Sequence, residues 1–105
     1  MGVVSEDDNT ILPVVNELLG NYPNPFNPET TIRFNVSEPG SILIEIYNVR
    51  GQRIRTLLNK HIDAGEHSII WNGQDENGRE VGSGIYLYIM RMEDFSQTQR
   101  MILMK

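Results

Sequence analysis

The sequence predicts a small all-β domain, an antiparallel β-sandwich of about seven strands. Two observations carry this prediction. Short runs rich in β-branched and aromatic residues alternate between apolar and polar side chains, and turn-forming residues separate these runs at fairly regular intervals. The length of 105 residues suits one domain, since a chain of this size buries roughly two-thirds of its unfolded surface.

Six strands are expected from residue 30 onward. They are expected at residues 30–36, 41–47, 52–58, 67–71, 85–89 and 95–104. In the first of these, Ile32, Phe34 and Val36 would share one buried face. In the third, the odd spacing of Ile54 and Leu57 indicates a bulge or a strand end. The segment 11–19 is expected to be an extended or one-turn lead-in, and a seventh strand is left open there.

The stretch from Trp71 to Ile85 predicts a hairpin. An apolar run ends at Trp71, a polar turn with two Asn-Gly pairs follows, and an aromatic run begins at Ile85. Asn and Gly accept the positive φ of tight hairpin turns, which makes this a strong local signal. A polar connection is expected over residues 59–66, before the strand that leads to Trp71.

The composition excludes several classes of protein. The fractions of 39% hydrophobic and 22% charged residues are those of a globular chain. A net charge of −5 with scattered basic residues excludes nucleic-acid binding. There is no cysteine, and no run reaches the ~20 apolar residues of a transmembrane helix. The acidic first ten residues lack the features of a signal peptide, so we expect the chain to be part of a longer protein.

No catalytic residue, metal site or cofactor is expected. A calcium loop around Asp75 fails because Gly73 and Gly84 stand where ligand oxygens are required. His61, Asp63, Glu66 and His67 have no spacing that suits zinc. The glycines of Gly82-Ser83-Gly84 are adjacent to the serine, unlike those of a nucleophile elbow. We therefore expect a protein that is not an enzyme.

Two groups of aromatic residues leave alternatives open. Trp71 is interpreted as a core anchor rather than a sugar-stacking residue. Tyr22 and Phe26 lie in a stiff, proline-rich loop and would either pin it to the core or form an exposed platform. An exposed row of Tyr22, Phe26, Tyr47 and Tyr86 would favour sugar binding.

Several motifs together resemble a known family. The most specific is Tyr22-Pro23-Asn24-Pro25-Phe26-Asn27-Pro28, and further motif positions are Trp71, Gly78, Gly84 and Tyr86. With the terminal Met101-Ile102-Leu103-Met104-Lys105, they resemble the type A C-terminal sorting domain of the bacterial type IX (Por) secretion system. They are also similar to the immunoglobulin-like module of flagellar hook-capping proteins. The motif positions before the last strand are expected to be structural.

This resemblance implies a function. It implies an immunoglobulin-like, non-catalytic domain over residues 18–105, preceded by a linker over residues 1–17. The domain would end a larger protein that crosses the periplasm and is secreted or displayed on the cell surface. Its partners would be the outer-membrane secretion machinery and the upstream domain of its own protein, and it would be monomeric. The resemblance places recognition in the last strand, at Arg100, Met101, Ile102, Leu103, Met104 and Lys105.

Two points stay open. Met101 and Leu103 could instead be core residues, and the domain could be a structural spacer or a carbohydrate-binding accessory module. The recognition hypothesis also has a physical basis, because a final strand at the edge of a sheet offers unpaired backbone groups to a partner strand.

Overall fold

The structure is a computed structural model that describes residues 12–105. The expected linker at residues 1–10 and the first residue of the lead-in lie outside the described residues. Every regular element is a strand, namely β1 (Glu17–Tyr22), β2 (Thr30–Val36), β3 (Gly40–Asn48), β4 (Arg53–Ile62), β5 (Gly65–Trp71), β6 (Gly84–Met92) and β7 (Phe95–Leu103). Within these residues, no helix is long and apolar enough to cross a membrane.

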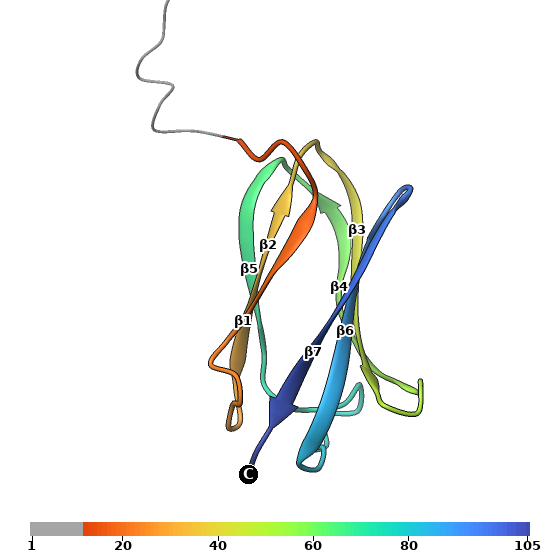
Figure 1. Ribbon diagram of the computed structural model, residues 1–105. Coiled ribbons are helices and arrows are strands. Elements are labelled where there is room, and N and C mark those ends of the chain that lie inside the picture. Colours follow the sequence, from red (N-terminus) through yellow and green to blue (C-terminus); the bar gives the residue numbers. More distant parts are fainter. Residues whose placement is uncertain (1–11) are drawn as a thin grey trace, which may run out of the picture.

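The strands form two antiparallel sheets that pack face to face (Figure 1). One sheet has the order β1-β2-β5 and the other has the order β4-β3-β6-β7. This is the predicted immunoglobulin-like sandwich, and the seventh strand left open in the lead-in is present as β1. β1 continues through Gly20, where the lead-in was expected to end. The register of β1 shifts between Leu18 and Gly20 in a β-bulge, and glycine readily adopts the φ of +110° found at Gly20.

The core lies between the sheets and follows the predicted alternation. Ile32, Phe34 and Val36 of β2 are all 1% exposed or less, as are Ile42, Ile44 and Ile46 of β3. Of their polar neighbours in sequence, Arg33 and Ser41 are exposed, while Thr31 and Asn35 are half-buried and Glu45 is only 7% exposed. Trp71 at the end of β5 is fully buried, which confirms that it is a core residue and not an exposed stacking platform.

The expected irregularity in the third strand is present in β4. Successive register partners against β3 are Ile44 with Leu58 and Glu45 with Thr56, so Leu57 is an extra residue. A second shift likewise leaves Ile54 without an opposite residue. These two bulges bring apolar side chains that are three residues apart against the same core. The strand is longer than expected and takes up residues 59–62 of the predicted polar connection.

The predicted hairpin from Trp71 to Ile85 is wrong. β5 and β6 belong to different sheets, so the segment 72–83 crosses from one layer to the other. The Asn-Gly turn signal is satisfied locally within this crossing. The N–H of Gly78 donates to the carbonyl of Asp75 over 3.0 Å, and Gln74 forms a bridge with Glu80. The Asn-Gly residues that are typical of a hairpin between two strands here form a small turn inside the loop.

Candidate partner-binding site at the last strand

The last strand lies at the outer edge of the four-stranded sheet (Figure 1). β7 pairs with β6 along its whole length, from Met92 opposite Phe95 to Gly84 opposite Leu103. Because side chains alternate along a strand, only four of the six residues expected to bind a partner reach the surface. Met101 and Leu103 are fully buried in the core, which makes them packing residues in the folded domain.

The remaining predicted residues face outward. Arg100 and Lys105 are exposed, while Ile102 is 37% exposed and Met104 is 57% exposed. Lys105 forms polar contacts with residues of the segment 72–83, which crosses between the sheets. Its N–H donates to Ser83 Oγ over 3.0 Å, and its ammonium group lies 3.1 Å from a carboxylate oxygen of Glu80.

The proline-rich loop covers the outer edge of this strand. The N–H of Phe26 donates to the carbonyl of Ile102 over 2.9 Å, and the N–H of Met104 donates to the carbonyl of Phe26 over 2.9 Å. The side-chain carbonyl of Asn24 accepts the N–H of Ile102 over 3.0 Å. We call Asn24 and Phe26 the clasp. The expectation that the last strand presents an open edge is therefore wrong at residues 102–104, where the loop satisfies the backbone.

The clasp is fixed by core packing. The Phe26 ring is 2% exposed and lies 5.7 Å from the ring of Trp71, measured between centroids, and Trp71 lies 5.4 Å from Tyr86. Gly73 permits the close approach of the loop. A Cβ at this position would lie 2.9 Å from the carbonyl oxygen of Pro28, and the φ of +77° also favours glycine.

The motif positions therefore serve structural roles of different kinds. Phe26, Trp71 and Tyr86 form an aromatic cluster in the core, while Gly78 (φ +81°) allows the turn inside the crossing and Gly84 (φ +155°) lies at the start of β6. Tyr22 is 81% exposed and does not pin the loop. Because Phe26 and Tyr86 are buried and Tyr47 is half-buried, the exposed aromatic row that would favour sugar binding is not formed.

A ladder of polar side chains joins β7 to β1 in the other sheet. Gln97 Oε1 accepts the N–H of Leu18 over 2.7 Å, and Gln99 Nε2 donates to the carbonyl of Leu18 over 3.1 Å. The Tyr88 hydroxyl lies 3.0 Å from Gln99 Oε1 and 3.1 Å from Asn21 Oδ1. Burial raises the pKa of this hydroxyl to about 12, because the charged phenolate loses its hydration. The ladder ties the two sheets together along this side of the sandwich.

One section of the β7 edge has no backbone partner on its outer side. The N–H and C=O of Ile102 point away from β6 and toward the clasp, so by alternation those of Ser96, Thr98 and Arg100 also point outward. Within residues 12–105 they form no hydrogen bond on that side. The edge is thus open in the middle of the strand and closed at its end.

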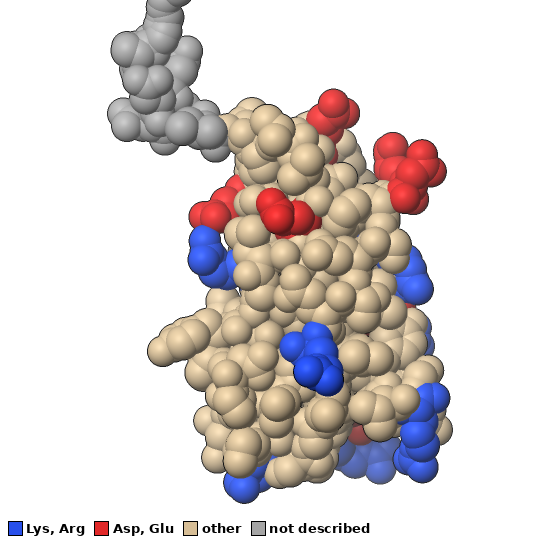
Figure 2. All heavy atoms as spheres, in the orientation of Figure 1, with Lys and Arg blue, Asp and Glu red and all other residues tan. Residues whose placement is uncertain are grey.

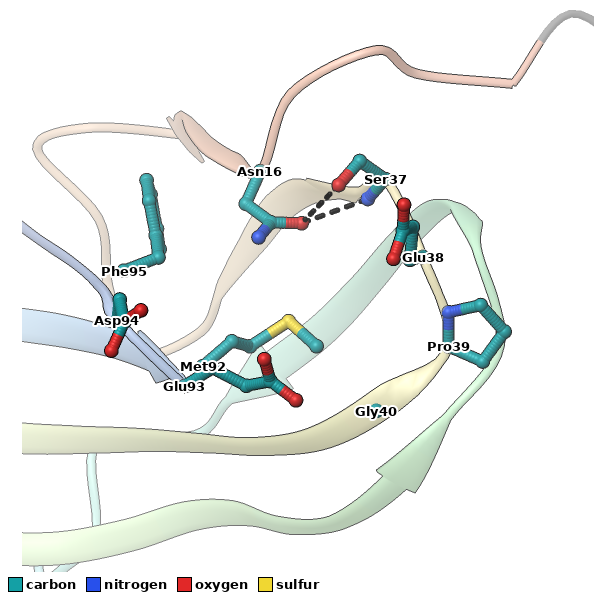
Figure 3. Close-up of a pocket in the computed structure, with 9 residues that line it drawn as sticks. All are labelled: Asn16, Ser37, Glu38, Pro39, Gly40, Met92, Glu93, Asp94 and Phe95. Carbon is teal, nitrogen blue, oxygen red and sulfur yellow. Dashed lines mark hydrogen bonds between the residues drawn. The ribbon is translucent and has the colours of Figure 1, made fainter.

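A shallow cavity of about 390 Å³ is lined by residues of the turn before β3 and of the turn between β6 and β7 (Figure 3). In Figure 1 these turns lie at the opposite end of the sandwich from the C-terminus. Asn16 Oδ1 accepts hydrogen bonds from the N–H and the hydroxyl of Ser37 beside it, over 2.8 and 3.1 Å. The lining residues are Asn16, Ser37, Glu38, Pro39, Gly40, Met92, Glu93, Asp94 and Phe95. The cavity combines exposed carboxylates with apolar walls.

The other residues considered from the sequence have local partners. The N–H of Arg79 and the N–H of Asn77 donate to the Asp75 carboxylate over 3.0 and 2.9 Å, and these bonds lower the pKa of the Asp75 carboxyl. His67 stacks on Phe34 at 5.5 Å, and its Nε2 lies 2.8 Å from the carbonyl of Asp63. Within residues 12–105, no three His, Asp or Glu side chains are placed to hold a metal ion together.

The strand order, the burial pattern and the exposed last strand define an immunoglobulin-like domain. The family model of the FlgD Ig-like domain matches residues 26–94, and the chain belongs to that family. No curated protein matches the chain.

Solved structures share the fold at low sequence identity. Dimeric latent PorU from Porphyromonas gingivalis matches with a TM-score of 0.67 and 22% identity over 89% of this chain and 10% of that one. PorZ from the same organism, a surface component of the type IX secretion system, matches with a TM-score of 0.55 and 22% identity over 82% and 11%. FlgD from P. aeruginosa matches with a TM-score of 0.58 and 15% identity over 87% and 76%. The chain thus spans about a tenth of the length of PorU and PorZ.

Proposed function

We propose that this domain is the non-catalytic C-terminal sorting module of a larger exported bacterial protein. An outer-membrane translocon would recognise it through its last strand, and the parent protein would be secreted or displayed on the surface. The single observation that carries the proposal is the presentation of β7. This strand lies at the edge of its sheet and exposes Arg100 and Ile102, and the exposed Met104 and Lys105 follow it directly.

The motifs of the chain support the same proposal. The proline-rich loop and the last strand both resemble the sorting-domain family, and they are in direct contact through the clasp. The similarity of fold to PorZ, a bacterial surface component of the type IX secretion system, agrees with a role in that pathway.

A reporter fusion tests the proposal. The full chain is attached to the C-terminus of a periplasmic reporter in a host that has a type IX secretion system, and surface-exposed reporter is measured in intact cells. We expect the fusion to reach the surface and the reporter without the chain to remain in the periplasm. Equal surface levels with and without the chain would reject the sorting function and leave a structural spacer.

Removing residues 100–105 is a weaker test. It would abolish export, but it also deletes the buried Met101 and Leu103, so the loss could come from unfolding. Exchanging the exposed Arg100 and Lys105 for glutamate leaves the core intact. We expect the double variant to melt within a few degrees of the parent chain and to reach the surface less efficiently.

A further inference from the structure

Two exposed isoleucines face solvent side by side on the outer face of the four-stranded sheet. Ile85 of β6 and Ile102 of β7 are register partners, with 39% and 37% of their surfaces exposed. Met104 follows at 57% exposed, and Arg100 lies two register pairs along on the same face, opposite the half-buried Leu87. We call Ile85, Arg100, Ile102 and Met104 the β6–β7 strip. Adjacent exposed apolar residues at a sheet edge are unusual in a monomer and mark interaction sites.

The last strand cannot be recognised as a detached peptide without disrupting the fold. Detachment would break the pairing with β6 along nine residue pairs and expose the side chains of Met101 and Leu103. It would also release the clasp from Ile102 and Met104. At residues 101–104, a partner that binds the native domain can therefore contact only the outward side chains.

Addition of a partner strand is also blocked at this end. The clasp already occupies the outward N–H and C=O of Ile102 and the N–H of Met104. Strand addition depends on such backbone groups, so at residues 102–104 they are not available. Recognition there must depend on side chains on the face of the sheet, where Ile85 lies directly beside Ile102.

Resting on the sorting function proposed above, we infer that the partner recognises the folded β6–β7 strip, so that Ile85 on β6 belongs to the signal together with the residues of β7. Arg100 forms no ion pair with any carboxylate in residues 12–105. On the face seen in Figure 2, basic side chains gather toward the end at which the chain terminates and acidic ones toward the other end. The occupant that fits is a protein surface with apolar side chains beside a carboxylate.

Single substitutions of exposed residues test this inference in the full-chain reporter fusion. Ile85→Ser and Ile102→Ser should each lower the ratio of surface to periplasmic reporter by about fivefold or more, the effect expected for a residue central to an interface. Arg100→Glu should have a comparable effect. The matched control is Ile70→Ser, which alters a 56% exposed isoleucine on the outer face of the three-stranded sheet and should leave export unchanged.

The outcomes separate the inference from the proposed function. If Ile102→Ser reduces export and Ile85→Ser does not, the tail alone is recognised and the inference is wrong, while the sorting function stands. If the unaltered fusion is not exported, both fail. Sedimentation of the purified chain gives a further outcome. A dimer that Ile85→Ser converts to a monomer would assign the strip to self-association and overturn the inference.

A disulfide staple gives a second and independent test. The chain contains no cysteine, so Ile89→Cys with Thr98→Cys creates one pair, at register partners across β6 and β7. The backbone of Thr98 points outward, so this is a non-hydrogen-bonded pair, whose close Cα atoms suit a disulfide. In the oxidising periplasm the staple would hold β7 on β6. We expect the stapled fusion to reach the surface as the parent fusion does. If the oxidised form alone is retained in the periplasm, β7 must detach for export and the inference is wrong.

Discussion

Phe26 and Ile102 are joined by a backbone hydrogen bond of 2.9 Å, from the N–H of the first to the carbonyl of the second. This bond connects the proline-rich loop near the start of the domain with the strand that completes it. The Phe26 ring is buried against Trp71, so the loop is anchored in the core while its backbone covers the edge of the sheet. One residue thus combines core packing with protection of an edge.

Truncation of Phe26 should weaken both the core packing and the protection of the sheet edge. Phe26→Ala is expected to lower the free energy of unfolding by about 3–5 kcal/mol, the usual cost of removing a buried phenyl ring. It should also speed hydrogen exchange at the N–H of Met104, which donates to the Phe26 carbonyl. Tyr22→Ala in the same loop is the control, since Tyr22 is 81% exposed, and should change stability by less than about 0.5 kcal/mol. Equal losses in the free energy of unfolding for the two substitutions, measured by urea denaturation, would contradict the role of Phe26 in the clasp.

Gly73 and Gly78 allow the cost of a close contact to be separated from that of backbone conformation. Their φ values of +77° and +81° are nearly equal, but only Gly73 has a neighbour that a Cβ would strike, the carbonyl oxygen of Pro28 at 2.9 Å. Gly78→Ala should cost about 1 kcal/mol through the left-handed backbone alone. Gly73→Ala should cost clearly more, because the loop that carries Phe26 must move. Thermal unfolding of the two variants measures the difference, and a Gly73→Ala variant as stable as Gly78→Ala would disprove the close approach.

The buried Tyr88 hydroxyl predicts a loss of stability at high pH. Its pKa in the folded state is raised to about 12 from a usual value of 10.0, so the folded protein holds this proton more tightly than the unfolded chain does. The stabilisation is complete below about pH 10 and is lost as the pH rises toward 12, by at most about 1.4 kcal/mol per pH unit. Tyr88→Phe should have a flatter profile in urea unfolding between pH 8 and 11.5. If the two proteins have identical profiles, the loss of stability at alkaline pH comes from groups other than Tyr88.

Glu45 is the centre of a small charged cluster on the outer face of the larger sheet. It is 7% exposed, and its carboxylate lies 3.1 Å from Arg91 and 3.5 Å from Arg53, while the Tyr47 hydroxyl donates to it over 2.9 Å. Glu45→Gln should cost about 1–2 kcal/mol, since it weakens three contacts to a shielded charge. The comparison is Glu66→Gln, in an exposed pair with Arg33, which should cost less than about 0.5 kcal/mol. Urea titrations in low and high salt would measure both, and a larger cost for Glu66→Gln would contradict this ranking.

The strands could be predicted because their side chains alternate. Ile32, Phe34 and Val36 follow a period of two residues, and burial on one face of a sheet requires that period. The odd spacing of Ile54 and Leu57 predicted a bulge or a strand end, and β4 has a bulge at each of these residues. The pairing of β5 with β6 was wrongly predicted, because the Asn-Gly turn residues specify a local reversal but not the sheet in which the next strand lies.

The clasp could not be predicted because its partners are far apart in the chain. Proline fixes the backbone of the loop, but nothing in the sequence indicates that the N–H of Phe26 meets the carbonyl of Ile102. For the same reason an open edge was expected where the structure has a covered one. The division of residues 100–105 into buried and exposed positions was partly visible, since Met101 and Leu103 alternate with Arg100, Ile102 and Met104.

The contribution of Met101 and Leu103 to the core has a consequence for synthesis of the protein. A nascent polypeptide that has not yet acquired these two residues lacks part of the interior of the domain, and the loop at Phe26 has no strand to cover. Products of premature termination would therefore not display the outward face of β6 and β7. A secretion apparatus that requires this face would discriminate, without any additional factor, between products that contain the complete domain and products that end within it.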